Sequence, residues 1–138
     1  MIDEGHLVAN HTYSHRDFTQ ISNDEILTDL RKLEDLYFQE FNIELAKIVR
    51  PPRGEYSEES QKTLANNGYK SVFWSLAYVA WYKDKYYGNE YSYNKVMSRI
   101  HNGAIILMHT VSKDNTYDLE KIITKLKEEY DFKLVDTL

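Results

Sequence analysis

Short apolar runs alternate along the chain with longer stretches in which apolar residues recur every three or four positions. The short runs predict strands at 7–10, 45–49, 70–75, 104–108 and 132–135. The longer stretches predict helices that follow Ser22, run from near Ser57 to Gly68, span 93–100, and carry Leu119, Ile122, Ile123 and Leu126 on one face. Such alternation with short connections is typical of βα units on a parallel sheet or barrel. The sequence therefore predicts an α/β fold.

Local sequence features set several boundaries. Ser22 and Glu25 have the spacing of a capping box, in which each side chain accepts a hydrogen bond from the other residue's backbone N–H at a helix start. Pro51 and Pro52 end the strand at 45–49, because proline lacks the N–H that a strand ladder needs. The run at 104–108 contains no polar residue, which is typical of a strand covered on both faces.

Composition narrows the classes of protein to consider. The 138 residues suit one domain at most. Their 17 Lys and Arg against 22 Asp and Glu give a net charge of −5, which argues against nucleic-acid binding by bulk phosphate neutralisation. The chain has no Cys, which excludes disulfides, thiolate zinc sites and Cys nucleophiles. The sequence shows neither a signal-peptide pattern nor an apolar run of about 18 residues, so no membrane span is predicted.

Residues suited to chemistry follow several of the predicted strands. His11, Arg50 and His109 each come directly after a strand, and an aromatic segment at 78–93 follows the strand at 70–75. Function collects at the carboxyl ends of the strands in parallel α/β folds. These residues are therefore expected on one face of the fold.

His11 and His15 stand four residues apart. Two neutral imidazoles at this spacing can chelate a divalent ion, with an Asp or Glu as a further ligand and one position left for water. The acids nearest in the sequence are Asp3, Glu4 and Asp17. The alternative is a pair of polar loop histidines that hold no metal.

The other candidates also have two interpretations each. Arg50 precedes a rigid turn and can orient a carboxylate, whereas the alternative is a strand-ending turn with solvated arginines. His109 suits proton transfer near neutral pH, and the alternative is a structural histidine in the core. The aromatic segment suits contact with the faces of sugars, and the alternative is packing.

Taken in order, these residues resemble three motifs of the polysaccharide deacetylase family, also called the NodB-homology domain or carbohydrate esterase family 4. Residues 11–15 match its metal motif His-[Ser/Thr]-x-x-His, residues 50–54 its Arg-x-Pro-x-Gly motif, and residues 106–109 its Leu-x-Leu-His motif. The similarity covers essentially the whole chain. It is greatest to the spore-cortex branch, the deacetylases that form muramic δ-lactam.

The resemblance implies a role for each candidate residue. In the family two His and one Asp hold a divalent ion, zinc or cobalt, which implies His11 and His15 as ligands. Arg50 would orient the catalytic base, and His109 would protonate the departing amine. The implied substrate contacts are the backbone N–H of Tyr56 as an oxyanion donor, Trp81 of the fourth motif, and Ile106 and Met108 in the acetyl pocket.

The chain departs from the family pattern in two places. The first motif, Thr-Phe-Asp-Asp, supplies the catalytic base and the acidic ligand, and this chain contains no Asp-Asp pair. The fourth motif, Asp-x-x-Asp-Trp, has Ala77 and Ala80 in place of both acids. The carboxylate that would keep the catalytic imidazole charged is therefore missing at that place.

The resemblance implies that residues 1–138 form the C-terminal portion of a NodB-type domain, a partial, distorted (β/α) barrel that lacks its first strands. The implied activity is metal-dependent de-N-acetylation of a cell-wall glycan, N-acetylmuramic acid in peptidoglycan, with no nucleic-acid partner. The alternative is a catalytically impaired or inactive remnant that binds glycan weakly at most. Unpaired barrel edges predict self-association. Family members usually act outside the cytoplasm, in the cell wall or the spore cortex.

Overall fold

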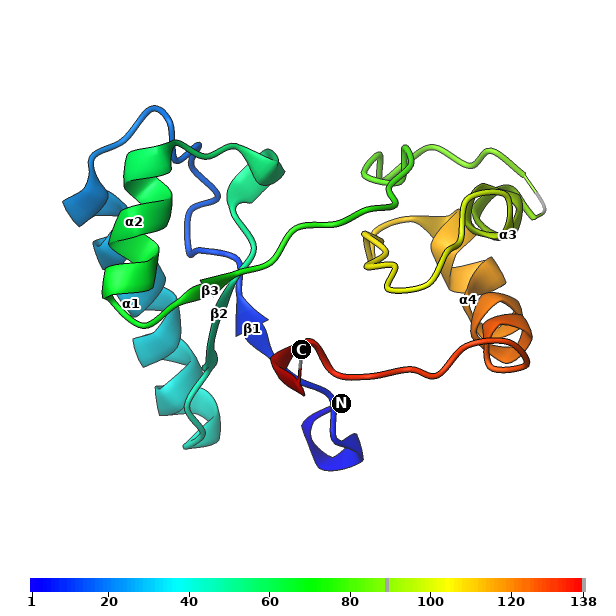
Figure 1. Cartoon of the computed structure of the whole chain (residues 1–138), viewed down its shortest axis with the longest axis horizontal. Helices are drawn as coiled ribbons and strands as arrows, with labels where there is room; N and C mark the ends of the chain where they lie inside the picture. Colours follow the sequence, from blue (N-terminus) through cyan, green and yellow to red (C-terminus); the bar gives the residue numbers. More distant parts are fainter. Residues whose placement is uncertain (89, 138) are drawn as a thin grey trace. The chain divides into compact units, whose positions relative to one another are not determined.

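The structure, a computed structural model, describes residues 1–88 and 90–137. They form two compact units, Met1–Phe73, called unit 1, and Trp74–Leu138, called unit 2 (Figure 1). Each unit has its own cluster of buried apolar side chains. Each unit therefore has a core of its own around which its elements pack.

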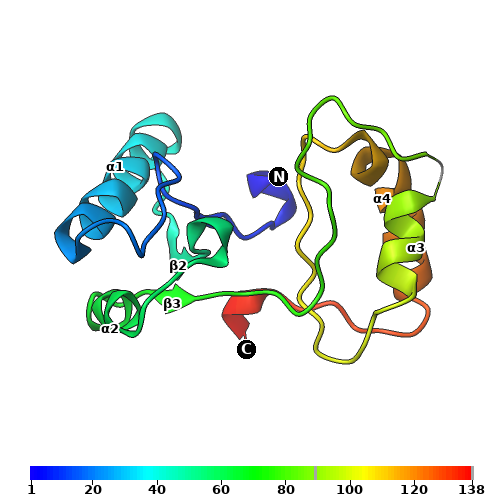
Figure 2. The same cartoon turned by 90° about the horizontal axis from the view of Figure 1, so that it is seen from above.

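Unit 1 contains a three-stranded parallel sheet in the order β1 (Ala9–Asn10), β2 (Ala46–Val49) and β3 (Lys70–Ser71). Helix α1 (Asn23–Phe41) connects β1 to β2, and α2 (Glu58–Asn66) connects β2 to β3. The two helices lie side by side and pack against the sheet (Figure 2). Short 3-10 helices, η1 (Ile2–Glu4) and η2 (Pro52–Gly54), precede β1 and follow β2. Parallel strands joined by helices confirm the predicted α/β class.

The helices of unit 1 begin where the sequence predicts. Ser22 Oγ accepts a hydrogen bond from Glu25 N, and the Glu25 carboxylate accepts one from Ser22 N, so the capping box is formed. Ser57 caps α2 in the same reciprocal way with Ser60. The apolar faces of both helices then enter one core, made of Phe18, Ile26, Leu30, Val49, Leu64 and Tyr69.

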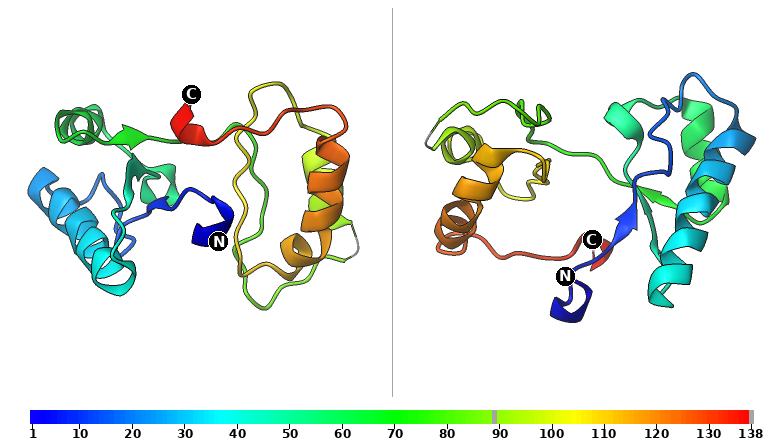
Figure 3. Two further views of the ribbon diagram at one scale, coloured as in Figure 1. Left: turned by 90° about the horizontal axis from the view of Figure 1, so that it is seen from below. Right: turned by 180° about the vertical axis from the view of Figure 1, so that it is seen from behind.

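Unit 2 is built mainly from α3 (Tyr91–Met97) and α4 (Lys113–Leu126), which lie side by side (Figure 3). A short 3-10 helix, η3 (Val135–Thr137), follows near the end of the chain. The core of the unit consists of Leu76, Tyr78, Ala80, Val96, Ile122 and Leu126. Within the described ranges, none of the helices is long and apolar enough to cross a membrane.

The strands predicted after residue 70 differ most from the structure. The third strand ends at Ser71 rather than at position 75. The run at 104–108 forms a single parallel bridge, between Ile106 and Leu76, and its side chains are half-exposed rather than covered on both faces. Residues 132–135 are not a strand and are largely exposed. An apolar run becomes a strand only where a neighbouring backbone pairs with it, and the described residues supply little pairing here.

Candidate active site

The loop after β1 holds His11 and His15 close together. Their ring centroids are 4.9 Å apart, with the ring planes at 83°. Thr12 and His15 both have left-handed backbone, with φ of 66° and 56°, and the Thr12 hydroxyl accepts a hydrogen bond of 2.9 Å from His15 N. Left-handed backbone is costly for a β-branched residue such as Thr12. The loop therefore needs other bonds to offset that cost.

Two buried polar side chains, Asn10 and Asp29, supply those bonds. The Asn10 side chain accepts a hydrogen bond of 2.8 Å from Thr12 N and donates one of 3.0 Å to Leu30 O. Asp29, on α1, accepts bonds of 3.1 Å from Ser14 N and 2.8 Å from Ser14 Oγ. Both ends of the loop between the two histidines are thus bonded to buried groups.

The orientation of His11 is set by a contact to the next strand. His11 Nδ1 lies 2.6 Å from the carbonyl oxygen of Arg50. A carbonyl only accepts hydrogen bonds, so Nδ1 carries the proton and donates, and Nε2 bears the lone pair of the neutral ring. Histidines that bind metals commonly donate their other ring N–H to a carbonyl or carboxylate in this way. The local bonding therefore fits a metal ligand.

Arg50 lies at the carboxyl end of β2, beside β1. Its backbone N–H donates a hydrogen bond of 3.0 Å to Asn10 O. The buried prolines Pro51 and Pro52 follow, and Arg53 has a left-handed backbone with φ of 57°. The rigid turn is therefore as predicted. Burial lowers the pKa of the Arg50 guanidinium, whose side chain is half-buried.

The neighbouring imidazoles of His11 and His15 are nitrogen donors of a kind that suits zinc or cobalt. Across residues 1–88 and 90–137, no third His, Asp or Glu joins them in a group that could hold a metal ion. Asp17 accepts hydrogen bonds from the backbone N–H and hydroxyl of Thr19, which lower the pKa of its carboxyl. Glu4 pairs instead with the terminal amine, 3.1 Å away. The acids nearest in the sequence, Asp3 included, therefore do not complete the ligand set in this structure.

Tyr56 lies between η2 and the start of α2. Its ring is exposed and stacks at a tilt on Phe73, with centroids 4.9 Å apart. The backbone N–H of Tyr56 donates to no other atom of the described residues. That N–H is thus available to an oxyanion, the role that the resemblance implies.

His109 and Trp81 lie together in unit 2. Their ring centroids are 6.1 Å apart at an angle of 70°, and Trp81 is half-exposed. Ile106 and Met108 are half-buried and pack against the core of this unit. Unit 2 thus presents an imidazole, an indole and an aliphatic surface on neighbouring segments.

The position of His109 depends on a buried amide from α4. The Asn115 side chain donates a hydrogen bond of 2.8 Å to His109 O. Its oxygen accepts bonds from Tyr78 OH and Ser92 Oγ, at 2.7 Å and 2.8 Å. Asn115 therefore connects the backbone of His109 with Ser92 of α3 and with Tyr78 of the aromatic loop.

Three supporting residues, Asn10, Asp29 and Asn115, are not among those that the sequence predicts. The signal available for Asp29 was its place on the apolar face of α1, between Ile26 and Leu30, because a charged residue in an apolar stripe needs a partner. Asn10 likewise ends an otherwise apolar strand. The predicted site residues fall into two groups, one in each unit: His11, His15, Arg50 and Tyr56 in unit 1, and Trp81, Ile106, Met108 and His109 in unit 2.

Comparisons with known proteins agree with these features. The family profile "Polysaccharide deacetylase" matches residues 1–72. The peptidoglycan-N-acetylmuramic acid deacetylase PdaA of Bacillus subtilis is 39% identical over 139 residues, which cover 100% of this chain and 53% of that protein. A protein of Geobacillus stearothermophilus is 44% identical over 100% of this chain and 52% of its own length. The chain thus spans about half the length of the curated relatives it matches.

Two solved structures show the same fold. That of Bacillus subtilis PdaA, a family 4 carbohydrate esterase, aligns with a TM-score of 0.92 and 38% identity, over 100% of this chain and 59% of that one. That of a family 4 pseudoenzyme from Bacillus anthracis aligns with a TM-score of 0.75 and 27% identity, over 93% of this chain and 44% of that one. The α/β architecture is thus a partial NodB-type fold. Because the family profile covers more than half of its residues, the chain belongs to the polysaccharide deacetylase family.

Proposed function

We propose that the chain takes part in the metal-dependent de-N-acetylation of N-acetylmuramic acid in peptidoglycan. The observation that carries the proposal is the paired imidazoles of His11 and His15, with Nδ1 of His11 bonded to the Arg50 carbonyl at the ends of parallel strands. Family membership supports the reaction class. The name of the Bacillus subtilis relative supports the choice of muramic acid as the sugar.

In this proposal the residues of unit 1 prepare the attack on the acetamide. His11 and His15 would hold a divalent ion, zinc or cobalt, which when bound polarises the carbonyl and acidifies water. Arg50 would orient the carboxylate base that takes a proton from this water, a group that the family's first motif supplies and that residues 1–138 do not contain. Arg50 itself remains charged at neutral pH because the ordinary pKa of Arg is far higher. The Tyr56 N–H donates to the oxyanion that forms as the water oxygen bonds to the carbonyl carbon.

The residues of unit 2 serve the leaving group and the sugar. His109 gives a proton to the amine nitrogen as the carbon–nitrogen bond breaks, which releases acetate and leaves an amino sugar. Trp81 offers a flat half-exposed face to the sugar ring, and Ile106 and Met108 offer apolar surface to the acetyl methyl group. Asn115 keeps the His109 backbone in place.

A second candidate function is weak glycan binding without turnover. Two observations favour it: Ala77 and Ala80 stand where the family has acids, and the described residues offer no third ligand beside His11 and His15. The Bacillus anthracis relative is likewise described as a pseudoenzyme. This candidate differs from the first in one measurable quantity, the release of acetate.

The test is acetate release from purified peptidoglycan, with and without added zinc. We expect release that depends on zinc and is abolished in His11→Ala. His6→Ala is the matched control, because His6 is exposed and lies in the same unit outside the proposed site, and it should keep the activity. Zinc-dependent release that survives His11→Ala would contradict the assignment of the metal ligands, and no release under any condition favours the second candidate.

The proposed substrate implies where the protein acts. A peptidoglycan substrate implies action outside the cytoplasm, and the muramic acid specificity implies a role in the spore cortex during sporulation. We further propose that the half-exposed run at 104–108 supports self-association, because apolar edges with few partners favour pairing between copies. Sedimentation velocity over a range of concentrations tests this, and a monomer throughout would contradict it.

A further inference from the structure

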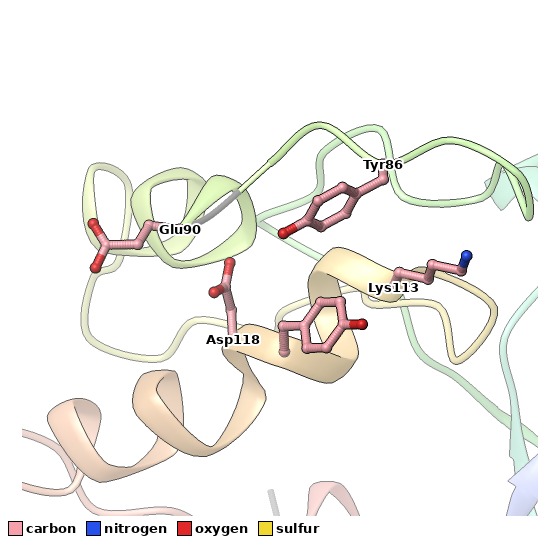
Figure 4. Close-up of a pocket in the computed structure, with 5 residues that line it drawn as sticks. Tyr86, Glu90, Lys113 and Asp118 are labelled. Carbon is pink, nitrogen blue, oxygen red and sulfur yellow. The ribbon is translucent and has the colours of Figure 1, made fainter.

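A hollow lies in unit 2, along the first turns of α4. It has a volume of about 610 Å³ and is lined by Tyr86, Glu90, Lys113, Tyr117 and Asp118 (Figure 4). None of these residues has a role in the proposed deacetylation. The hollow therefore needs a separate explanation.

One wall of the hollow is aromatic. The Tyr86 and Tyr117 rings meet edge to face, with centroids 5.8 Å apart and planes at 70°. Tyr86 is 48% exposed and Tyr117 is 70% exposed, so both rings offer open surface. Flat amphipathic rings of this kind suit the face of a pyranose, because the carbon–hydrogen face packs on the ring while the phenol hydroxyl stays hydrated.

A carboxylate and an ammonium group lie apart in the same hollow. Asp118 is only 6% exposed, and its carboxylate points toward the hollow in Figure 4. One of its oxygens accepts a hydrogen bond of 3.1 Å from Tyr93 N, and the rest of the described chain supplies no second bond. Lys113 stands five positions earlier on α4, about 7.5 Å along the helix axis at 1.5 Å per residue. Its ammonium makes no ion pair with any described residue.

The other acid of the hollow is already paired. Glu90 forms an ion pair with Lys121, whose ammonium also lies 4.1 Å from the centre of the Tyr93 ring. Asp118 also interacts electrostatically with Lys121 but forms no ion pair with it in the described part of the chain. Asp118 is therefore the carboxylate with an oxygen left for a ligand, and Lys113 is the cation. A matching ligand has a positive group and a negative group on one sugar-sized body.

From this arrangement we propose that the hollow binds a muramic acid unit whose amine is free. The amine, protonated at neutral pH, lies at Asp118, the lactyl carboxylate lies at Lys113, and the pyranose lies against Tyr86 and Tyr117. The inference rests on the proposed function, because such a unit is the product of that reaction on glycan whose lactyl group carries no peptide. N-acetylmuramic acid lacks the ammonium group and glucosamine lacks the carboxylate, so the hollow distinguishes processed glycan from unprocessed glycan.

The test is a titration of the full chain at pH 7, followed by NMR, with muramic acid, N-acetylmuramic acid and glucosamine. We expect muramic acid to bind about tenfold tighter than either other sugar, the factor that one modest charge contact contributes. Lys113→Gln should bring muramic acid down to the affinity of glucosamine. Asp118→Asn, which keeps an acceptor for Tyr93 N, should bring it down to that of N-acetylmuramic acid. Lys83→Gln is the control, since Lys83 is exposed and lies outside the hollow, and it should change nothing.

The outcomes separate this inference from the proposed activity. Equal affinity for the three sugars, or a preference that Lys113→Gln leaves intact, overturns the site even where acetate release is confirmed. A preference for muramic acid that both substitutions remove supports the site even where no acetate is released. Tyr117→Ala, an exposed substitution, should weaken all three sugars together, and an unchanged affinity would remove the aromatic wall from the proposal.

Discussion

The two units hold their candidate catalytic residues by different means. In unit 1, His11 and Arg50 stand at the ends of paired strands, and backbone hydrogen bonds between the strands set their spacing. In unit 2, His109 follows a segment that forms a single bridge with the described residues, and a side chain from α4 bonds the His109 backbone. Where the sheet is short, buried polar side chains of a helix replace the ladder that a sheet would supply.

The buried acids among the described residues follow the same division, with two in unit 2 and one in unit 1. Asp114 accepts hydrogen bonds from Tyr87 N and Gly88 N, and Asp118 accepts one from Tyr93 N, so α4 holds much of the aromatic loop. In unit 1 a single acid, Asp29, has a comparable role. Losing a buried acceptor leaves backbone donors unsatisfied, which costs more than an average hydrogen bond. Substituting a buried acid should therefore lower the free energy of unfolding more in unit 2 than in unit 1.

The largest expected effect is that of Asp114→Ala. Asp114 is 1% exposed, and its removal leaves the N–H groups of Tyr87 and Gly88 without their acceptor. We expect the free energy of unfolding to fall by about 3 kcal/mol. Chemical denaturation measures this, with Glu120→Ala as an exposed control on the same helix. If Asp114→Ala and Glu120→Ala had equal denaturation midpoints, the buried Asp114 would not stabilise unit 2, and the contrast between the units would be wrong.

Asp29→Ala is the matching change in unit 1. We expect a smaller loss, of about 2 kcal/mol, because both of its bonds go to one residue, Ser14. The left-handed turn at Thr12 should also relax, and zinc affinity measured by calorimetry should fall because His11 and His15 lose their fixed spacing. Asp35→Ala on the exposed side of α1 should alter neither quantity. If Asp29→Ala lowered the stability but left the zinc affinity unchanged, the bonds from Ser14 to Asp29 would not be needed to hold His11 and His15 in place.

Helix caps give a third and smaller contrast. Ser112 and Ser22 both accept a hydrogen bond from the backbone N–H three residues ahead, but Ser112 is buried and Ser22 is exposed. We expect Ser112→Ala to lower the free energy of unfolding by about 1–2 kcal/mol and Ser22→Ala by about 0.5–1 kcal/mol. Thermal unfolding of the two variants under one condition compares them directly. The reverse order would indicate that burial of the cap does not govern its contribution.

The smallest expected effect is a pH dependence at the start of α1. Hydrogen bonds from the Ser22 backbone N–H, then from the Ser22 hydroxyl and Arg16, lower the pKa of Glu25 to about 2 from an ordinary value of 4.5. A lowered pKa means that the contribution of Glu25 is complete above pH 4.5 and is lost as the pH falls to about 2. Glu25→Gln should therefore flatten the fall in melting temperature between pH 5 and pH 2. An unchanged profile would mean that the exposed carboxylate contributes nothing.

Much of unit 1 could be predicted from the sequence because its signals are local. Ser22 and Ser57 mark the helix starts through hydrogen bonds to residues three positions ahead, and Pro51 ends the preceding strand because it has no N–H to donate. The predictions of strands at 104–108 and 132–135 were wrong. Apolarity shows that a segment avoids water, but a strand also needs a partner backbone, which depends on residues far away in the sequence.

The same limit applies to the candidate site. His11, His15 and Arg50 could be found from their spacing and from their places after strands. The place of Asp29 in an apolar stripe indicates that it needs a partner, but the partner could not be predicted. Its bond to Ser14 joins residues 15 positions apart and forms only once α1 packs on the sheet. Asn115 and His109 are nearer in sequence, but their bond involves a backbone carbonyl, which leaves no trace in residue type.

Thr12 has a consequence for anyone who redesigns the histidine loop. A glycine there would tolerate the left-handed backbone but would lose the hydroxyl that accepts a hydrogen bond from His15 N. A valine would lose the same hydrogen bond and would still be strained by the left-handed backbone. Only short side chains with an oxygen meet both demands, so a library at this position should retain Ser, Asn and Asp. Transplanting the loop to another scaffold would require its supports as a set: Asn10, Thr12, Ser14 and Asp29.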